Sequence, residues 1–212
     1  MIFILTNILG ERKKEMNIKE ELLRKVSMTE DIQLNDIDTD IGKIKAVMIN
    51  EVVPADPSQD FYGNADSDYI KTTIQLFEKS GLNINGINDI LSMGIYITNA
   101  VKVPKNEYAV SRESIEKSLP YLENELALFP DIKVIMLMGD VAKKSFNMIA
   151  KKQTGKNMVP SFSTYRLRES ELYYRNIRVM PSYIMTGGSI QIEKSKIQMI
   201  SEDISVMADL IK

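Results

Sequence analysis

The sequence predicts a three-layer α/β/α fold, in which helices cover both faces of a mostly parallel central sheet. Three apolar runs rich in branched residues, at 43–49, 94–100 and 133–138, have the length of buried strands. Segments with apolar residues at helical spacing lie between them. Because strands that alternate with helices form parallel sheets covered on both faces, this order favours an α/β architecture.

The expected helices have recognisable ends as well as helical spacing. The first follows Asn17, Ser80-Gly81 closes the second, and Ser111 is a plausible N-cap of the third. These helices span 18–28, 68–79, 111–129, 141–151 and 190–211.

The connections are polar. Residues 31–40 form an acidic surface connection, 158–170 a basic loop, and 171–180 a hairpin that turns at Arg175-Asn176. Ligands of parallel sheets bind at the carboxyl ends of the strands, so the loops that follow strands carry most functional interest. These loops are 50–64, 98–104, 139–140 and 181–189.

Length and composition favour one domain over residues 1–212, with an N-terminal extension and helix at 1–40 and a core at 43–212. The 212 residues are 44% hydrophobic and 26% charged, which is the balance of a globular protein. The apolar start, residues 1–10, is too short for a membrane span and lacks the basic region of a secretory signal. We expect a cytoplasmic protein, with Met16 as an alternative start.

The missing residue types limit the chemistry. The chain has no cysteine and no histidine. Disulfides, iron–sulfur clusters, thiolate zinc sites and imidazole catalysis are therefore impossible. We expect no metal and no cofactor, and any catalysis must use carboxylates, amides, hydroxyls, lysine, tyrosine or backbone groups.

Charge is unevenly distributed along the chain, although the net charge is only −2. Residues 141–178 contain nine bases and two acids, a net +7, whereas residues 20–68 contain twelve acids and four bases, a net −8. A chain divided in this way can present a basic face to a phosphate backbone. Solvated surface charge is the alternative.

Five short stretches, in order, carry a resemblance to one family. They are residues 47–54, similar to an apolar strand running into Gly-Glu-Ala-Pro-Gly; 61–63, similar to Pro-Phe-x-Gly; 96–102, similar to Tyr-Ile-Thr-Asn-x-x-Lys; 134–139, similar to Val-Ile-x-Leu-x-Gly; and 180–183, in the place of His-Pro-Ser-Tyr. Together they resemble the uracil-DNA glycosylase superfamily, and the family 4 type enzymes most of all. The resemblance covers about residues 45–186.

Three departures from that pattern matter. The first motif has an extra residue and Asn50 in place of glycine. The cysteines that bind a cluster are absent. Met180 replaces the motif histidine, and its thioether cannot donate a hydrogen bond to a departing base.

The resemblance implies a pocket for a flipped base. Asn99 would read the O4 and N3–H of uracil, and Phe61, or its neighbour Tyr62, would stack on the ring. Glu51 or Asp56 would orient a water or oppose the sugar cation. The structural alternatives are a loop-capping Asn, core aromatics and solvated carboxylates.

The resemblance also implies DNA contacts. The loop with Ser182, Tyr183, Gly187 and Gly188 would enter the duplex or hold a phosphate, and Lys102 could contact phosphates too. A simple turn and a solvated charge are the alternatives.

These implications favour a DNA glycosylase that hydrolyses the N-glycosidic bond of uracil or another deaminated base, with weak or altered activity because of Met180. The alternative is a non-catalytic nucleic-acid or nucleobase-binding protein that retains the fold. A nucleotide-binding domain of other function is less favoured, because no glycine-rich phosphate loop follows a strand.

Overall fold

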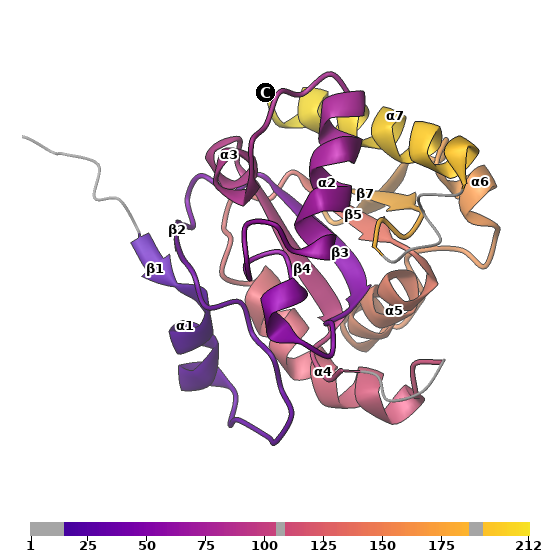
Figure 1. Cartoon of the computed structure of the whole chain (residues 1–212). Coiled ribbons are helices and arrows are strands. Elements are labelled where there is room, and N and C mark those ends of the chain that lie inside the picture. The colour runs from indigo at the N-terminus through magenta and orange to yellow at the C-terminus, as the bar shows by residue number, and fades with distance from the viewer. Residues whose placement is uncertain (1–14, 105–108, 187–192) are drawn as a thin grey trace, which may run out of the picture.

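A five-stranded sheet forms the centre of the computed structural model, which describes residues 15–104, 109–186 and 193–212 (Figure 1). β3 pairs in parallel with β4 and β5, and β5 pairs in parallel with β7. The prediction that the three apolar runs are neighbours in one parallel sheet is confirmed. In spatial order the strands are β4 (Ile95–Val101), β3 (Ala46–Val52), β5 (Val134–Met138), β7 (Ile177–Ser182) and β6 (Leu172–Tyr174).

Helices cover both faces of this sheet, so the predicted three-layer fold is confirmed. Successive strand residues point to opposite faces. Val47 packs in a cluster with Leu122 and Phe146 of α4 and α5, whereas Met48 packs in a second cluster with Phe77 and Ile204 of α2 and α7. The bounds are α2 (Asp68–Lys79), α4 (Arg112–Leu126), α5 (Asp140–Thr154) and α7 (Lys194–Ile211).

Local signals fix several helix ends. The Ser67 side chain accepts a hydrogen bond from the Ile70 N–H at 3.2 Å, and α2 covers the predicted residues. The Ser111 side chain caps α4 through the Ser114 N–H at 3.0 Å, as predicted. Short elements were not predicted, because they hold too few residues to show a periodicity. They are α3 (Ile87–Ser92), α6 (Thr164–Leu167) and the 3-10 turn η1 (Pro57–Gln59).

The N-terminal segment is more ordered than the sequence predicted. α1 (Ile18–Lys25) forms the start of the expected helix, capped by the Asn17 side chain. The expected polar connection contains β2 (Asp38–Asp40), which pairs antiparallel with β1 (Glu15–Asn17). The expectation for the apolar start concerns positions outside the described residues, whereas Met16, the alternative start, lies in β1 opposite Thr39.

Two strands extend beyond their predicted ends, which moves polar residues out of loops. β3 begins three residues later than predicted and continues to Val52, so Asn50 and Glu51 belong to the strand. The hairpin of β6 and β7 turns at Arg175, with φ 55°, as predicted. However, β7 continues through Ser182 and pairs with β5.

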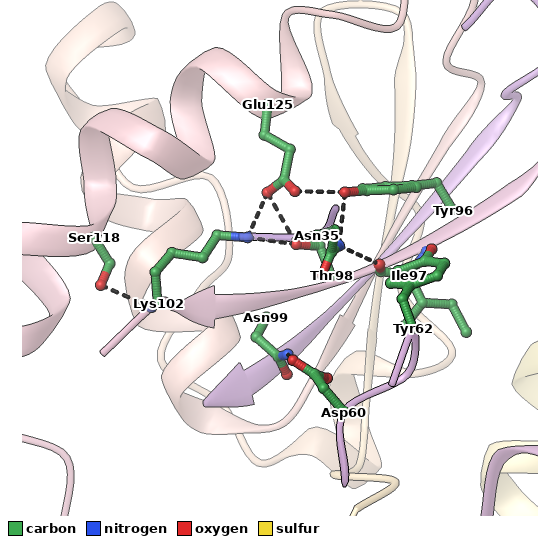
Figure 2. Close-up of polar contacts among 10 residues, drawn as sticks. All are labelled: Asn35, Asp60, Tyr62, Tyr96, Ile97, Thr98, Asn99, Lys102, Ser118 and Glu125. Atoms are coloured by element: carbon green, nitrogen blue, oxygen red, sulfur yellow. Dashed lines mark hydrogen bonds and ion pairs between the residues drawn. The ribbon is translucent and has the colours of Figure 1, made fainter. Parts of the chain in front are cut away.

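The outer edge of β4 is capped by side chains from other segments. The Tyr62 hydroxyl accepts the Ile97 N–H at 3.0 Å, and Asn35 Nδ2 donates to the Ile97 carbonyl at 3.2 Å. The Asn35 amide also donates to the Tyr96 hydroxyl at 2.7 Å (Figure 2). Both backbone groups of Ile97 are therefore satisfied at this edge.

Candidate functional site

A buried amide and a buried carboxylate meet near the carboxyl end of β4. Asn99 is 1% exposed, and its Nδ2 donates to both carboxylate oxygens of Asp60, at 3.0 and 3.1 Å (Figure 2). Asp60 Oδ1 also accepts the Phe61 N–H at 2.8 Å. Burial raises the pKa of Asp60, and the hydrogen bonds from Phe61 and Asn99 oppose the rise. Asn99 Oδ1 has no partner among the described residues, so one acceptor remains unused.

Asn50 places a second amide beside the first. Asn50 and Asn99 are register partners on adjacent parallel strands, so their side chains project from the same face. Asn50 is fully buried, and neither its Oδ1 nor its Nδ2 has a partner within the described part of the chain. An unpaired buried polar group costs about 1–3 kcal/mol. The two amides therefore hold unused donors and acceptors at the strand ends.

Phe61 lies next to this polar pair, and Tyr62 has a different role. Phe61 is 1% exposed, and its ring centroid lies 5.1 Å from that of Tyr69. The Tyr69 hydroxyl donates to the Val52 carbonyl at 3.2 Å. Tyr62 instead stacks on Tyr96 and accepts from the β4 backbone. Of the two predicted aromatics, Phe61 is therefore the one linked to Asn99, because Asp60 accepts hydrogen bonds from the Phe61 N–H and from the Asn99 amide.

Glu51 lies between the end of β3 and the start of α5. Its Oε1 accepts the Val141 N–H at 3.0 Å, a favourable place for a carboxylate at a helix N-terminus. Gly139 has φ +104°, and a β-carbon there would collide with the Glu51 carboxylate, so glycine is required. Burial raises the pKa of Tyr69, and the charges of Asp60 and Glu51 add to the rise. Glu51 therefore shares its electrostatic surroundings with the Asp60–Phe61 region.

Asp56 does not join these residues. It is exposed, and its carboxylate accepts the Ser58 N–H at 2.9 Å as the cap of η1. The structure therefore gives this predicted catalytic carboxylate a capping role.

Lys102 corrects the expected phosphate contact. Its side chain is 1% exposed, and its ammonium lies 2.6 Å from Glu125 and 2.6 Å from the Thr98 hydroxyl (Figure 2). Glu125, fully buried on α4, also accepts from the Thr98 hydroxyl at 2.9 Å and the Tyr96 hydroxyl at 2.6 Å. A buried carboxylate needs such compensation, and it keeps Lys102 inside the protein, away from any phosphate.

Ser182 is likewise buried. Its hydroxyl donates to Asp203 at 2.5 Å, and Arg168 Nε holds the same carboxylate at 2.8 and 2.9 Å. Tyr183 is half-buried, with the Lys196 ammonium 5.7 Å from its ring centroid. The Ser182 side chain is therefore part of the interior in this structure. Gly187 and Gly188 lie outside the described residues.

Met180, in the place of the motif histidine, is a core residue of β7. It is 6% exposed and belongs to the cluster that contains Met136, Met138 and Phe61. Because this cluster contains Phe61, the thioether lies in the same layer as the two amides.

The basic segment forms a groove along α5. Its volume is about 610 Å³, and four bases and one acid are among its lining residues: Arg112, Lys143, Lys144, Lys151 and Asp140. Phe162 also lines it, is 54% exposed, and carries the Arg166 guanidinium 4.7 Å from its ring centroid. α5 begins where Glu51 binds its backbone, so the groove starts beside the candidate site.

Asn50, Asp60 and Tyr69 were not predicted as site residues from the sequence. Asp60 directly precedes Phe61, and a carboxylate beside an aromatic in this loop was the available signal. Tyr69 lies in the first turn of α2 and carries no motif. All three residues became recognisable as site residues only through neighbours that are distant in sequence.

A comparison with protein-family models places this chain. A family model described as "Uracil DNA glycosylase superfamily" matches residues 39–187. No curated protein matches the sequence. Among the described residues no helix is long and apolar enough to cross a membrane, and no cluster of acidic side chains could hold a metal ion.

Proposed function

Because the chain belongs to the uracil-DNA glycosylase superfamily, we propose that it hydrolyses the N-glycosidic bond of uracil or another deaminated base in DNA. The base would be extruded from the stack and bound between Phe61 and the amides of β3 and β4.

The observation that carries this proposal is the fixed orientation of the Asn99 amide. Asp60 accepts from Asn99 Nδ2, so Oδ1 is the atom left unpaired. The reverse orientation would place Oδ1 against a carboxylate, which repels it. The free Oδ1 can accept an N–H, and the second Nδ2 hydrogen can be donated to an adjacent carbonyl. This pattern matches the lactam edge of uracil, hypoxanthine and xanthine, and it does not match cytosine.

Base excision needs three kinds of assistance. The bond between C1′ and the base nitrogen breaks, and its electron pair leaves with the base. A water oxygen then bonds to C1′ and gives up a proton, and the base anion takes up a proton. Buried amide donors stabilise the departing anion, and a carboxylate opposes the positive charge on the sugar. We assign the carboxylate role to Glu51.

The basic groove supports DNA as the partner. Lys144 and Lys151 are exposed on α5, and Phe162 offers an exposed ring on which a base can stack. A strand whose flipped base enters at the strand ends can continue along this groove.

Met180 favours a second function, a non-catalytic protein that binds nucleic acid or a nucleobase. Its thioether gives the departing base no hydrogen bond. A pocket can still recognise a base through Asn99 without breaking the bond.

Labelled oligonucleotides distinguish the two functions. Single- and double-stranded substrates with one uracil, hypoxanthine or xanthine are incubated with the protein, and abasic sites are cleaved with alkali. We expect slow excision, and Asn99→Ala and Glu51→Gln should each lower its rate about a hundred-fold or more.

The matched controls are the same substitutions on the exposed side of α4. Asn124 and Glu123 make only exposed contacts, so Asn124→Ala and Glu123→Gln should leave the rate unchanged. Binding without excision would support the binding protein. Excision that survives both site substitutions would show that the site lies elsewhere.

A further inference from the structure

Asn50 is costly to the fold, because its buried side-chain amide forms no hydrogen bond with the described residues. The side chain is fully buried, and none of the described residues bonds either of its polar atoms. A leucine of similar shape would fill the space without an unpaired amide, so folding stability does not explain an asparagine here. Asn50 and Asn99 also do not bond to each other, although they are register partners.

We propose that Asn50 is a catalytic residue, whose side-chain Nδ2 donates a hydrogen bond to the carbonyl oxygen next to the departing nitrogen of the base. This inference rests on the proposed function. It assigns to Asn50 the donor that Met180 cannot supply.

The strand register supports a pocket in which Asn99 and Asn50 bind different carbonyl groups of the base. Uracil carries two carbonyl groups on either side of one N–H. The Asn99 amide is oriented to bind the N–H and one carbonyl. Neighbouring strands lie about 4.8 Å apart, which is similar to the separation of the two carbonyl oxygens. A side chain on the adjacent strand, in register and on the same face, is therefore suited to the second carbonyl.

The chemistry makes this donor important. When the glycosidic bond breaks, the electron pair on the base nitrogen delocalises onto the neighbouring carbonyl oxygen. The negative charge there is greater in the transition state than in the bound substrate. A donor fixed in a dry site therefore accelerates bond cleavage more than it strengthens binding.

The test compares two leaving groups in single-turnover excision. Asn50→Leu and Asn50→Ala are assayed on single-stranded oligonucleotides with one uracil or one 5-fluorouracil. We expect the uracil rate to fall about a hundred- to thousand-fold. The loss should be smaller for 5-fluorouracil, because fluorine already stabilises the anion. Equal losses on both substrates, or no loss, would overturn the role of Asn50.

Ser145→Ala is the matched control. The Ser145 hydroxyl is also fully buried and without a partner in the described part, but it lies on α5 and outside the site. Its removal should leave both rates unchanged. Urea unfolding should show that Asn50→Leu is at least as stable as the wild type, which separates a catalytic defect from misfolding.

A binding measurement separates failure of this inference from failure of the proposed function. The probe is an oligonucleotide with one 2′-fluoro-2′-deoxyuridine, which resists cleavage. If the wild-type protein neither excises uracil nor prefers this probe to the corresponding thymidine probe, the proposed function is overturned, and this inference with it. If the wild-type protein prefers the probe but does not excise uracil, the catalytic role of Asn50 is overturned. Excision unaffected by Asn50→Leu overturns this inference alone.

Discussion

Removing the Lys102 ammonium should severely destabilise the protein. Lys102→Met keeps most of the side-chain volume but leaves Glu125 buried without its cation. Breaking one partner of a buried ion pair costs about 3–5 kcal/mol. Whole domains are stable by only about 5–15 kcal/mol, so the loss is a large fraction of the total.

The magnitude follows from the contacts of Glu125. Tyr96 and Thr98 still donate to the carboxylate after the substitution, so the charge is not left without hydrogen bonds. No water can replace the ammonium without opening the core, because both partners are at most 1% exposed. For a chain of this length, about 3–5 kcal/mol corresponds to a fall in Tm of roughly 6–20 °C.

Urea unfolding at equilibrium measures this prediction, and the exposed pair of Lys152 and Glu123 provides the control. That pair joins Glu123 of α4 to Lys152 of α5, with a separation of 2.9 Å, but Lys152 is 72% exposed. Lys152→Met should cost about 0–1 kcal/mol. The double variant Lys102→Met/Glu125→Gln should recover part of the loss, because it removes both charges. Equal costs for Lys102→Met and Lys152→Met would refute the reasoning.

Three further predictions concern pH, salt and backbone strain. Burial raises the pKa of Asp60 in the folded state, so this carboxylate binds more protons in the folded chain, and its contribution to the free energy of unfolding should fall as pH rises above about 4; urea titrations across pH should show that Asp60→Asn removes this contribution, as a difference in slope from the wild type, and parallel profiles would contradict it. Lys144→Gln and Lys151→Gln should each reduce the salt dependence of single-stranded DNA binding by about 0.7 in the log–log slope, measured by fluorescence anisotropy, whereas an unchanged slope would exclude groove contacts. Gly139→Ala should cost more in urea unfolding than Gly155→Ala, because Gly139 has φ 104° and ψ 178°, a region that only glycine commonly occupies, and a β-carbon there meets the Glu51 carboxylate, whereas Gly155 is left-handed, with about 1–2 kcal/mol of strain for other residues, and has open space; equal costs would contradict both reasons.

The sequence predicted the sheet because the strand signal is local. Buried parallel strands are continuous apolar runs, and β3, β4 and β5 were recognisable from their own residues. Their ends were less predictable, because Asn50 and Glu51 are polar and read as loop. They remain in the strand because β4 continues beside them in register.

The candidate site was predicted only in part, because motif residues do not reveal their partners. The resemblance names Asn99 and Phe61, and the structure links them through Asp60, which accepts the Phe61 N–H and, across 39 residues of chain, the Asn99 amide. A lysine ammonium is a common phosphate ligand. Only the position of Glu125 shows that the Lys102 ammonium is instead paired with a carboxylate in the protein interior. A charged residue that follows a strand is therefore ambiguous without its tertiary neighbours.

The capped edge of β4 has a consequence for association between copies of the chain. An exposed edge strand offers its N–H and C=O groups to a strand of another molecule, which is a route to aggregation. At Ile97, Tyr62 and Asn35 occupy both groups with side chains. Both caps precede β4 in the chain, so a ribosome synthesises them before the strand that they protect. The edge of the nascent sheet can therefore be blocked as soon as it forms, before intermolecular pairing begins.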